Sequence, residues 1–261
     1  MKINEYYRDT ANMNLNGSIA ALVPPIFIIV GNFFVLKHRD VFVFALPFII
    51  YSLISFQVYL FRIRQSIAIR RNMKVASNSS NSIFKARHLL ILFQNTQSSC
   101  LFMYFPNGHL AGQIKKFRGK GLERLKLSRT FTLFNEENQA VGFYRVKGRK
   151  VLKIEVFDHK KDYLGSFEKR NTGFRKSKKA LFDHLGRYVG GVEGSSLFMD
   201  ELVLDHGHHK VGRLRRGWMP IEWSLVFPEA NTPILSLKEG MSEKDKLLRI
   251  SFLINEYFVE R

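Results

Sequence analysis

Three Asp-His pairs are the residues of this chain whose types suggest acid-base or metal chemistry. The pairs, with two histidines that follow the last of them, are Asp158 and His159, Asp183 and His184, Asp205 and His206, and His208 and His209. An imidazole beside a carboxylate is a common arrangement for proton transfer, and imidazole nitrogens are common zinc ligands. The spacing of the pairs along the chain decides whether such chemistry is expected.

The pairs occupy equivalent positions of a repeated pattern. Residues 156–165 read VFDHKKDYLG, residues 181–190 read LFDHLGRYVG, and residues 203–212 read VLDHGHHKVG. Further copies are residues 133–142, residues 104–112 and a weaker sixth at residues 225–235. Asp and Asn favour turns because their side chains hydrogen-bond the local backbone and tolerate positive φ. Each copy therefore predicts a β-hairpin, and the Asp-His pairs are expected to lie spread along a rim of turns.

Motifs of known enzyme classes do not add support for catalysis. The chain contains no G-x-S-x-G, no P-loop and no H-E-x-x-H motif. Its single cysteine, Cys100, rules out an intrachain disulfide and a site built from several thiolates. We expect a protein that is not an enzyme, with no catalytic residue, no metal site and no cofactor.

Two long uncharged stretches near the N-terminus predict membrane-spanning helices. Residues 18–36 and 41–61 contain no charged side chain. At about 1.5 Å per residue each stretch is long enough to cross a hydrocarbon core of about 30 Å. The four residues between them, KHRD, fit the tight turn of a helical hairpin. Residues 1–17 are expected to form an N-terminal tail.

The distribution of Lys and Arg predicts the orientation of this hairpin. Two basic residues precede the first span, two lie in the turn, and five follow the second span within residues 62–74. Because a hairpin places both ends of the chain on one side, the positive-inside rule puts both termini and the C-terminal domain in the cytoplasm. The expected location is the cell membrane, as a multi-pass protein.

The rest of the chain predicts a basic β-rich domain. Residues 62–86 are expected to form a basic juxtamembrane helix and a polar linker, and residues 87–261 the domain itself. Alternation of apolar and polar residues, as in residues 151–156, predicts roughly a dozen short strands, and a meander of that many strands usually closes into a barrel. Residues 247–258 are apolar nearly all round, so they predict a buried C-terminal helix, with Ser242 as its N-cap and Asp245 in its first turn.

This layout resembles the tubby C-terminal-like superfamily, which includes phospholipid scramblases and the plant LURP-one-related proteins. The resemblance rests on the hairpins that contain Gly165, Gly190 and Gly212 and on residues 244–258, KDKLLRISFLINEYF. It implies a closed antiparallel barrel of about twelve strands around a hydrophobic C-terminal helix, and lipid binding as a class of function. It departs from scramblases, which carry a cysteine-rich segment and an acidic calcium-binding stretch.

A strong positive charge indicates what the barrel binds. The formal net charge is +19, and residues 62–129 hold 14 basic residues against the single acid Glu123. Such an excess is the footprint of a polyanionic partner. Several basic clusters follow the repeat glycines, so we expect them to gather at one end of the barrel. The predicted lipid-binding residues are Lys115, Lys116, Arg118, Lys147, Arg149 and Arg213.

Three functions fit these observations to different degrees. The first is a membrane-anchored, non-enzymatic binding module that contacts anionic phospholipid or a membrane-associated protein. The second is lipid translocation by hairpin and barrel together, which would require the single hairpin to oligomerise. Nucleic-acid binding suits the charge alone, but the stacking aromatics of recognisable RNA-binding motifs are missing, so no nucleic-acid partner is expected.

Overall fold

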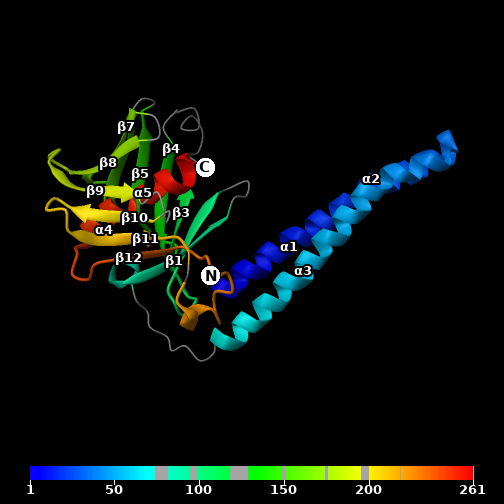
Figure 1. Ribbon diagram of the computed structural model, residues 1–261, viewed down its shortest axis with the longest axis horizontal. Helices are drawn as coiled ribbons and strands as arrows, with labels where there is room; N and C mark the ends of the chain where they lie inside the picture. Colours follow the sequence, from blue (N-terminus) through cyan, green and yellow to red (C-terminus); the bar gives the residue numbers. More distant parts are fainter. Residues whose placement is uncertain are drawn as a thin grey trace. The chain divides into compact units, whose positions relative to one another are not determined.

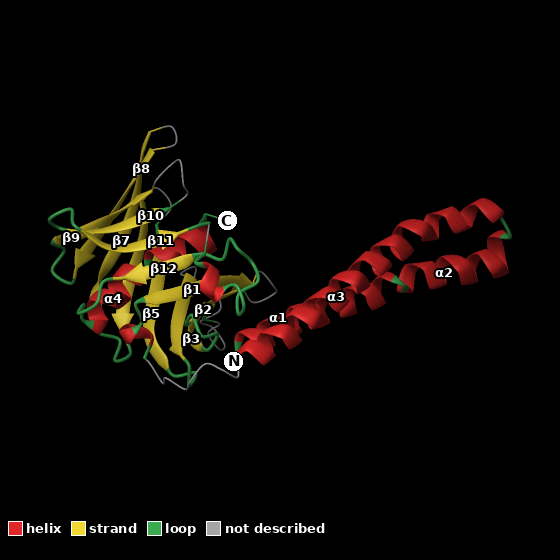
Figure 2. Ribbon diagram, turned by 60° about the horizontal axis from the view of Figure 1, so that its bottom comes forward, coloured by secondary structure: helices red, strands yellow, loops and turns green. Residues whose placement is uncertain are grey.

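A computed structural model describes residues 1–73, 82–94, 99–117, 129–148, 151–173, 176–194, 200–217 and 219–260. The chain divides into two compact units, Met1–Ser77 and Asn78–Arg261. The first is helical and the second is a β-barrel that encloses a helix (Figures 1 and 2). Each unit is described by itself.

The first unit is a helical hairpin. Its elements in chain order are α1 (Ile3–Ala21), α2 (Val23–Gly31), a π-helical turn (Asn32–Leu36), a 3-10 helix (Arg39–Ala45) and α3 (Leu46–Met73). Pro24 and Pro25 occupy the first turn of α2, where a missing backbone N–H is tolerated, so the helix is interrupted at Leu22. The Asn32 side chain accepts a 2.9 Å hydrogen bond from the His38 backbone N–H and stabilises the tip.

Both arms are long and apolar enough to cross a membrane. The two helical regions run from Ile3 to Phe34 and from Asp40 to Met73. They extend the expected spans, because α1 already includes most of the segment expected as a tail, and α3 continues through the basic residues after Phe61. The chain is helical up to Met73, through the first part of the segment expected as a juxtamembrane helix, while residues 74–81 lie outside the described residues.

Small and hydroxyl-bearing side chains form the contact between α1 and α3. The Ser18 hydroxyl lies 2.9 Å from the Ser52 carbonyl oxygen and 3.0 Å from the Ser52 hydroxyl. Further along, the Ser66 hydroxyl donates to the Asn4 carbonyl at 2.7 Å. Small residues allow close approach of helices, and hydroxyl bonds between them replace the missing hydrophobic driving force in lipid. These bonds also fix which levels of the two helices lie side by side.

The second unit contains twelve described strands in a closed antiparallel barrel, which confirms the expected fold. The strands are β1 (His88–Gln94), β2 (Cys100–Tyr104), β3 (Leu110–Lys116), β4 (Arg129–Asn135), β5 (Ala140–Lys147), β6 (Val151–Asp158), β7 (Tyr163–Gly173), β8 (Lys176–Asp183), β9 (Tyr188–Gly194), β10 (Glu201–Asp205), β11 (Lys210–Arg215) and β12 (Ile234–Leu237). Each strand pairs with its sequence neighbour, and pairing of β12 with β1 closes the ring, with Leu235 opposite Leu89.

Five hairpins share one turn geometry, as the repeated pattern predicts. In the β8–β9 turn the Asp183 carboxylate accepts backbone N–H bonds from Leu185 at 2.9 Å and Arg187 at 2.8 Å. The residue two positions before the second strand has positive φ, as at Gly186, where φ is 78°. A register shift follows in every one of these hairpins. This is a type I turn closed by a left-handed residue and a bulge.

The repeat glycines mark the place where neighbouring hairpins meet. Gly190 pairs with Leu181 on one side and with Asp205 on the other. Gly112, Gly142 and Gly165 likewise lie opposite the Asn or Asp of the next hairpin, whereas Gly212 lies opposite Leu237. The φ of Gly190 is 151°, and a Cβ there would lie 2.1 Å from the Leu204 carbonyl oxygen. Only glycine fits this close approach of backbones.

The C-terminal helix fills the barrel. It consists of α4 (Glu243–Ile250), α5 (Phe252–Ile254) and a π-helical turn (Asn255–Val259), and Ser242 caps it by accepting the Asp245 N–H at 3.1 Å. Phe252, Leu253 and Ile254 have no exposed surface and belong to the same core cluster as inward side chains of the strands. The expected buried helix is confirmed.

The prediction of a sixth hairpin is wrong. Residues 225–233 lie in the connection between β11 and β12, after the 3-10 turn Ile221–Trp223, and form no hairpin. The sixth strand pair is instead β12 with β1, whose ends are joined only through the rest of the chain. Apolar residues before Pro228 resemble a strand end in sequence, but Phe227 packs its ring edge against Tyr104 at 6.3 Å.

Candidate anion-binding surface

The Asp-His pairs lie in separate turns at one end of the barrel. Asp205 shows how they are used, because its Oδ1 accepts 2.9 Å bonds from the N–H groups of Gly207 and His209. These bonds lower the pKa of Asp205 although desolvation opposes them. Within the described part of the chain, no three His, Cys, Asp or Glu side chains are grouped to hold a metal ion. The geometry gives these carboxylates a role in turns.

The predicted lipid-binding residues lie toward the other end. Strands β3, β5 and β11 each run away from the tight turns. Lys115 and Lys116 end β3 and are exposed, Lys147 ends β5, and Arg213 lies in the second half of β11. The sheet therefore brings four of the six predicted residues to one end. Arg118 and Arg149 lie outside the described residues.

Two of these four cations are already paired with acids of the barrel. The Lys147 Nζ lies 2.8 Å from Glu155 Oε1. Arg213 donates through Nε at 2.9 Å, and also through an Nη, to the Asp200 carboxylate, which is 6% exposed. Partial desolvation opposes ionisation of Asp200, yet the bonds from Arg213 and the Arg216 backbone lower its pKa. Arg213 is thus a structural partner of Asp200 as well as a surface cation.

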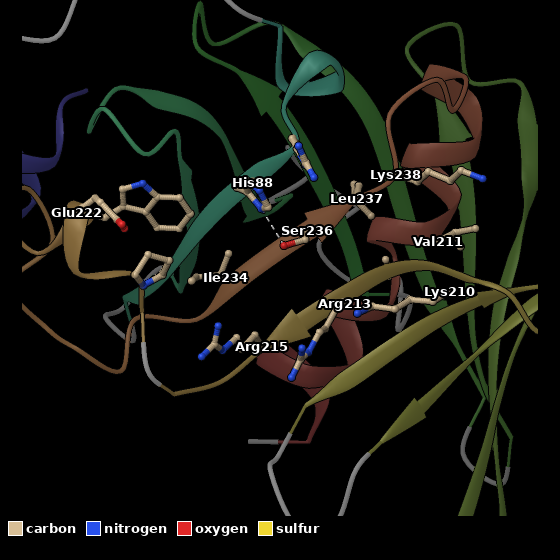
Figure 3. A pocket seen from close by; sticks show the side chains of 14 residues that line it. His88, Lys210, Val211, Arg213, Arg215, Glu222, Ile234, Ser236, Leu237 and Lys238 are labelled. Atoms are coloured by element: carbon tan, nitrogen blue, oxygen red, sulfur yellow. Dashed lines mark hydrogen bonds between the residues drawn. The ribbon is translucent and has the colours of Figure 1, made fainter.

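A groove of about 590 Å³ runs along the outer face of β11, β12 and β1 (Figure 3). Strand alternation points Arg213 and Arg215 outward, while Leu214 between them is buried in the core. Pro220 and Trp223 form a wall, contributed by the segment that links β11 to β12. Figure 3 shows Lys210 and Lys238 at the end of the groove away from Glu222. The remaining lining residues are Arg87, His88, Val211, Gly212, Glu222, Ile234, Ser236 and Leu237.

The groove is positively charged. Its described lining includes five Lys and Arg side chains and one acid, Glu222. Lys210, Arg215 and Lys238 have no acid within ion-pair distance among the residues that the structure describes. These three side chains are available to an external anion. A concave wall focuses their potential and strengthens it relative to that of isolated surface cations.

His88 contributes a neutral polar group to the floor. Burial, followed in size by the charge of Arg87, lowers the pKa of His88, so its ring is uncharged at neutral pH. One ring nitrogen, Nδ1, lies 2.9 Å from the Ser236 hydroxyl, as the dashed line in Figure 3 shows. The ring centre lies 5.7 Å from that of Trp223. The floor therefore offers hydrogen-bonding groups beside an aromatic wall.

A buried ion-pair network joins the C-terminal helix to the strands at the end opposite the tight turns. Lys179 Nζ lies 2.8 Å from both Glu201 Oε1 and Glu256 Oε1, and Arg216 lies 2.8 Å from Glu256 Oε2. Desolvation raises the pKa of Glu201, against the hydrogen bond from Lys179. The same penalty acts on Glu256, but bonds from two cations outweigh it and lower its pKa. This network stabilises the helix in place and leaves Lys179 unavailable to ligands.

Two basic side chains of the helix donate hydrogen bonds to backbone carbonyl groups of the second unit. Arg249, which interrupts the apolar sequence, donates an Nη bond of 3.0 Å to the Leu204 carbonyl. Lys246 Nζ donates to the Phe84 carbonyl. A buried cation is costly unless it is paired or hydrogen-bonded, and both donors find acceptors here. The basic residues that interrupt the apolar sequence therefore attach the helix to the structure around it.

Sequence reasoning missed most residues of the groove. Lys210 and Lys238 are isolated in sequence, and Trp223 lies just before residues 225–235, which resembled a sixth hairpin. Arg215 belonged to the basic run 213–216, and the R-x-R spacing on a strand could have placed Arg213 and Arg215 on one face. Pairing of β12 with both β11 and β1 was not available from the pattern, and this pairing assembles the groove.

Comparisons with known proteins are sparse. No protein-family model matches the chain, and no curated protein matches it. A similar solved structure is the X-ray structure of a protein from Arabidopsis thaliana, at 12% sequence identity and a TM-score of 0.39, covering 69% of this chain and 94% of that one.

Proposed function

We propose that this chain is a membrane-anchored, non-enzymatic binding module whose barrel contacts anionic phospholipid. The observation that carries the proposal is the groove on β11, β12 and β1, where Lys210, Arg215 and Lys238 face outward without an acidic partner among the described residues. A phospholipid surface presents many phosphates, and each nearby Lys or Arg gains about 1 kcal/mol at an anionic leaflet. The exposed Lys115 and Lys116 add to the attraction.

Two further points support a lipid surface over other polyanions. The hairpin provides helices that can cross a membrane, and residues 74–81 join them to the barrel by a segment of at most about 30 Å. Anionic lipid would therefore always be within reach. The twelve-stranded barrel around a C-terminal helix also has the layout of the tubby C-terminal-like superfamily, for which lipid binding is a known class of function.

The proposal is tested with the full chain in nanodiscs of neutral lipid, mixed with separate vesicles of varied headgroup charge. Flotation of the vesicles then measures binding between the barrel and a second membrane. We expect co-flotation with acidic vesicles and little with neutral ones. Binding should fall steeply between 0.01 M and 0.15 M salt, because the Debye length shortens from about 30 Å to about 8 Å.

A groove variant with a matched control separates the groove from net charge. Lys210, Arg215 and Lys238 are changed together to Glu, and the control changes Lys160, Lys161 and Lys244, which are exposed and lie outside the groove lining. Both triple variants alter the net charge equally. The groove variant should lose most binding and the control should keep most of it. Equal losses would show that the groove does not carry the interaction, and equal binding to neutral and acidic vesicles would overturn the proposal, leaving a membrane protein as the partner.

Arg213 is not suitable for charge reversal. A glutamate there would face the buried Asp200 carboxylate, which Arg213 now neutralises, and would destabilise the barrel. The predicted set is therefore tested by changing Lys115, Lys116, Arg118, Lys147 and Arg149 to Glu and leaving Arg213 in place.

A further inference from the structure

The uncharged segments of the two arms of the hairpin begin and end at different levels. The Ser18–Ser52 and Ser66–Asn4 bonds fix an antiparallel register in which the residue numbers of facing positions sum to about 70. The uncharged run of α3 ends at Phe61, which is therefore level with Asp9 of α1. The uncharged, apolar run of α1 begins only at Ser18. Residues 10–17 of α1, TANMNLNG, are consequently level with residues 53–60 of α3, LISFQVYL, which are apolar apart from Ser55 and Gln57.

Two asparagines of this segment lie on the outer face of α1. The face of α1 that packs on α3 carries the buried residues Ile3, Tyr7, Ala11 and Ser18. Asn12 and Asn16 are exposed and, at 100° per residue, project from the opposite side of the helix. Their spacing of four residues places them in one line, and the exposed Ala20 continues it by another turn. Within the described residues, neither amide side chain has a hydrogen-bond partner.

A single hairpin in a bilayer cannot place the polar segment of α1 and the apolar segment of α3 favourably at the same depth. If the bilayer covers α3 as far as Phe61, Asn12 and Asn16 face hydrocarbon, where an amide without a partner is costly. If the bilayer ends at Ser18, then Leu53, Ile54 and Phe61, which are 60%, 58% and 59% exposed, face water. The second placement exposes a large apolar surface. The first leaves only the exposed amides of Asn12, Asn16 and Gln57 to be satisfied, and neutral amides can satisfy each other.

We infer that the outer face of α1 packs against the same face of a second copy of this chain within the membrane. A second copy inserted in the same orientation necessarily carries its own Asn12 and Asn16 at the same depth. A two-fold axis along the membrane normal then places each amide beside its equivalent, and an amide both donates and accepts, so the surface is complementary to itself. Ala20, being small, allows the close approach that such bonds need. Asp9 lies on the same line at the level of Arg62, where the bilayer ends and water screens the two carboxylates from each other.

Disulfide cross-linking in liposomes at low protein-to-lipid ratio tests this contact. Cys100 is buried, and burial raises the pKa of its thiol to about 12 although Lys115 opposes this, so it is a poor cross-linking partner and is replaced by Ser as a precaution. Single cysteines at Asn12 and at Asn16 should give a covalent dimer. A cysteine at Leu53, which is equally deep and 60% exposed on the outer face of α3, should not. Equal cross-linking at Leu53 and Asn16 would overturn the inference.

Energy transfer between labelled copies in vesicles gives a second readout that does not depend on added cysteines in the contact. The N12L/N16L variant should associate about tenfold more weakly than the wild type, and N12Q/N16Q should retain association because it keeps the amides. Unchanged transfer in N12L/N16L, or equal loss in both variants, would contradict the inference. None of these measurements involves the groove, so the inference and the proposed lipid contact can fail separately.

Discussion

At the scale of single residues, the turn carboxylates are the positions where sequence suggested chemistry and structure shows architecture. Asp158, Asp183 and Asp205 each use one oxygen to accept two backbone N–H groups. Asn135 makes the same bonds with a neutral side chain, from the N–H groups of Glu137 and Gln139. A turn of this kind needs a side-chain oxygen that accepts the two backbone N–H groups. It does not need that side chain to be charged.

The Asp205→Asn and Asp205→Ala variants test this role. Asn keeps the acceptor, so its thermal midpoint should stay near that of the wild type, while Ala leaves two N–H groups without their partner and should lower it. Hydrogen bonds lower the pKa of Asp205 in the folded state, so its charge stabilises the fold above the unfolded pKa of about 3.9 and this contribution is lost as the pH falls further. Any difference between wild type and Asp205→Asn that comes from this charge should therefore shrink as the pH falls below about 3.9. A midpoint of Asp205→Ala equal to that of Asp205→Asn would contradict the role.

Gly190→Ala should destabilise the barrel far more than Gly186→Ala. At Gly190 a Cβ would lie 2.1 Å from the Leu204 carbonyl oxygen, so the backbone must move, and this should lower the free energy of unfolding by roughly 1–3 kcal/mol or more. At Gly186 φ is 78° and a Cβ meets nothing within 4 Å. The only penalty is that of placing Ala in a left-handed backbone conformation, which should lower the free energy of unfolding by about 1 kcal/mol. Thermal unfolding of both variants in detergent checks the order. Equal midpoints would show that the close approach at Gly190 relaxes freely.

At the scale of elements, the repeat predicted five hairpins, and the apolar run of residues 247–258 predicted the C-terminal helix. Both predictions succeeded because the sequence signals of a turn, a strand and a helix are local. Turn residues, alternation and an apolar run each act over a few positions. The sixth hairpin failed since pairing of β12 with β1 depends on residues nearly 150 positions apart, and no local pattern records it. The groove was unpredictable for the same reason. Helix α1 was underestimated at its start because its first turns contact α3, a tertiary effect that overrides the polar composition of residues 3–17.

The ion-pair network predicts how the C-terminal helix is held. Lys179→Met leaves Glu201 and Glu256 buried without their shared cation, and breaking such a pair costs roughly 3–5 kcal/mol at neutral pH. Glu201 would then have a further raised folded pKa, while Glu256 keeps its bond from Arg216, so the loss should shrink as the pH falls and Glu201 takes up its proton. Lys178→Met is the control, since Lys178 is exposed on the same strand and has no acid within ion-pair distance among the described residues. A loss that is independent of pH, or shared by the control, would contradict the assignment.

At the scale of the whole molecule, the sequence predicted two membrane helices and a separate barrel, and the structure has two long apolar helices in one unit and the barrel in the other. Orientation stays a prediction that rests on the count of basic residues. A cysteine at His38, in the hairpin tip, should react with a membrane-impermeant maleimide on intact cells, and a cysteine added after Arg261 should react only after permeabilisation. Cys100→Ser serves as the background. The reverse pattern would place both termini outside.

The position of the C-terminal helix also has a consequence for the order of synthesis. The residues that fill the barrel, Phe252, Leu253 and Ile254, follow all twelve described strands in the sequence, so they leave the ribosome after the strands that surround them. At about 5–20 residues per second, the 184 residues 78–261 take roughly 10–40 s to appear. Throughout that interval the strands have an apolar inner face and nothing to close around. The strands therefore keep this face uncovered until the helix has been made, and a chain that stops before Phe252 should fail to fold and should be degraded by proteases.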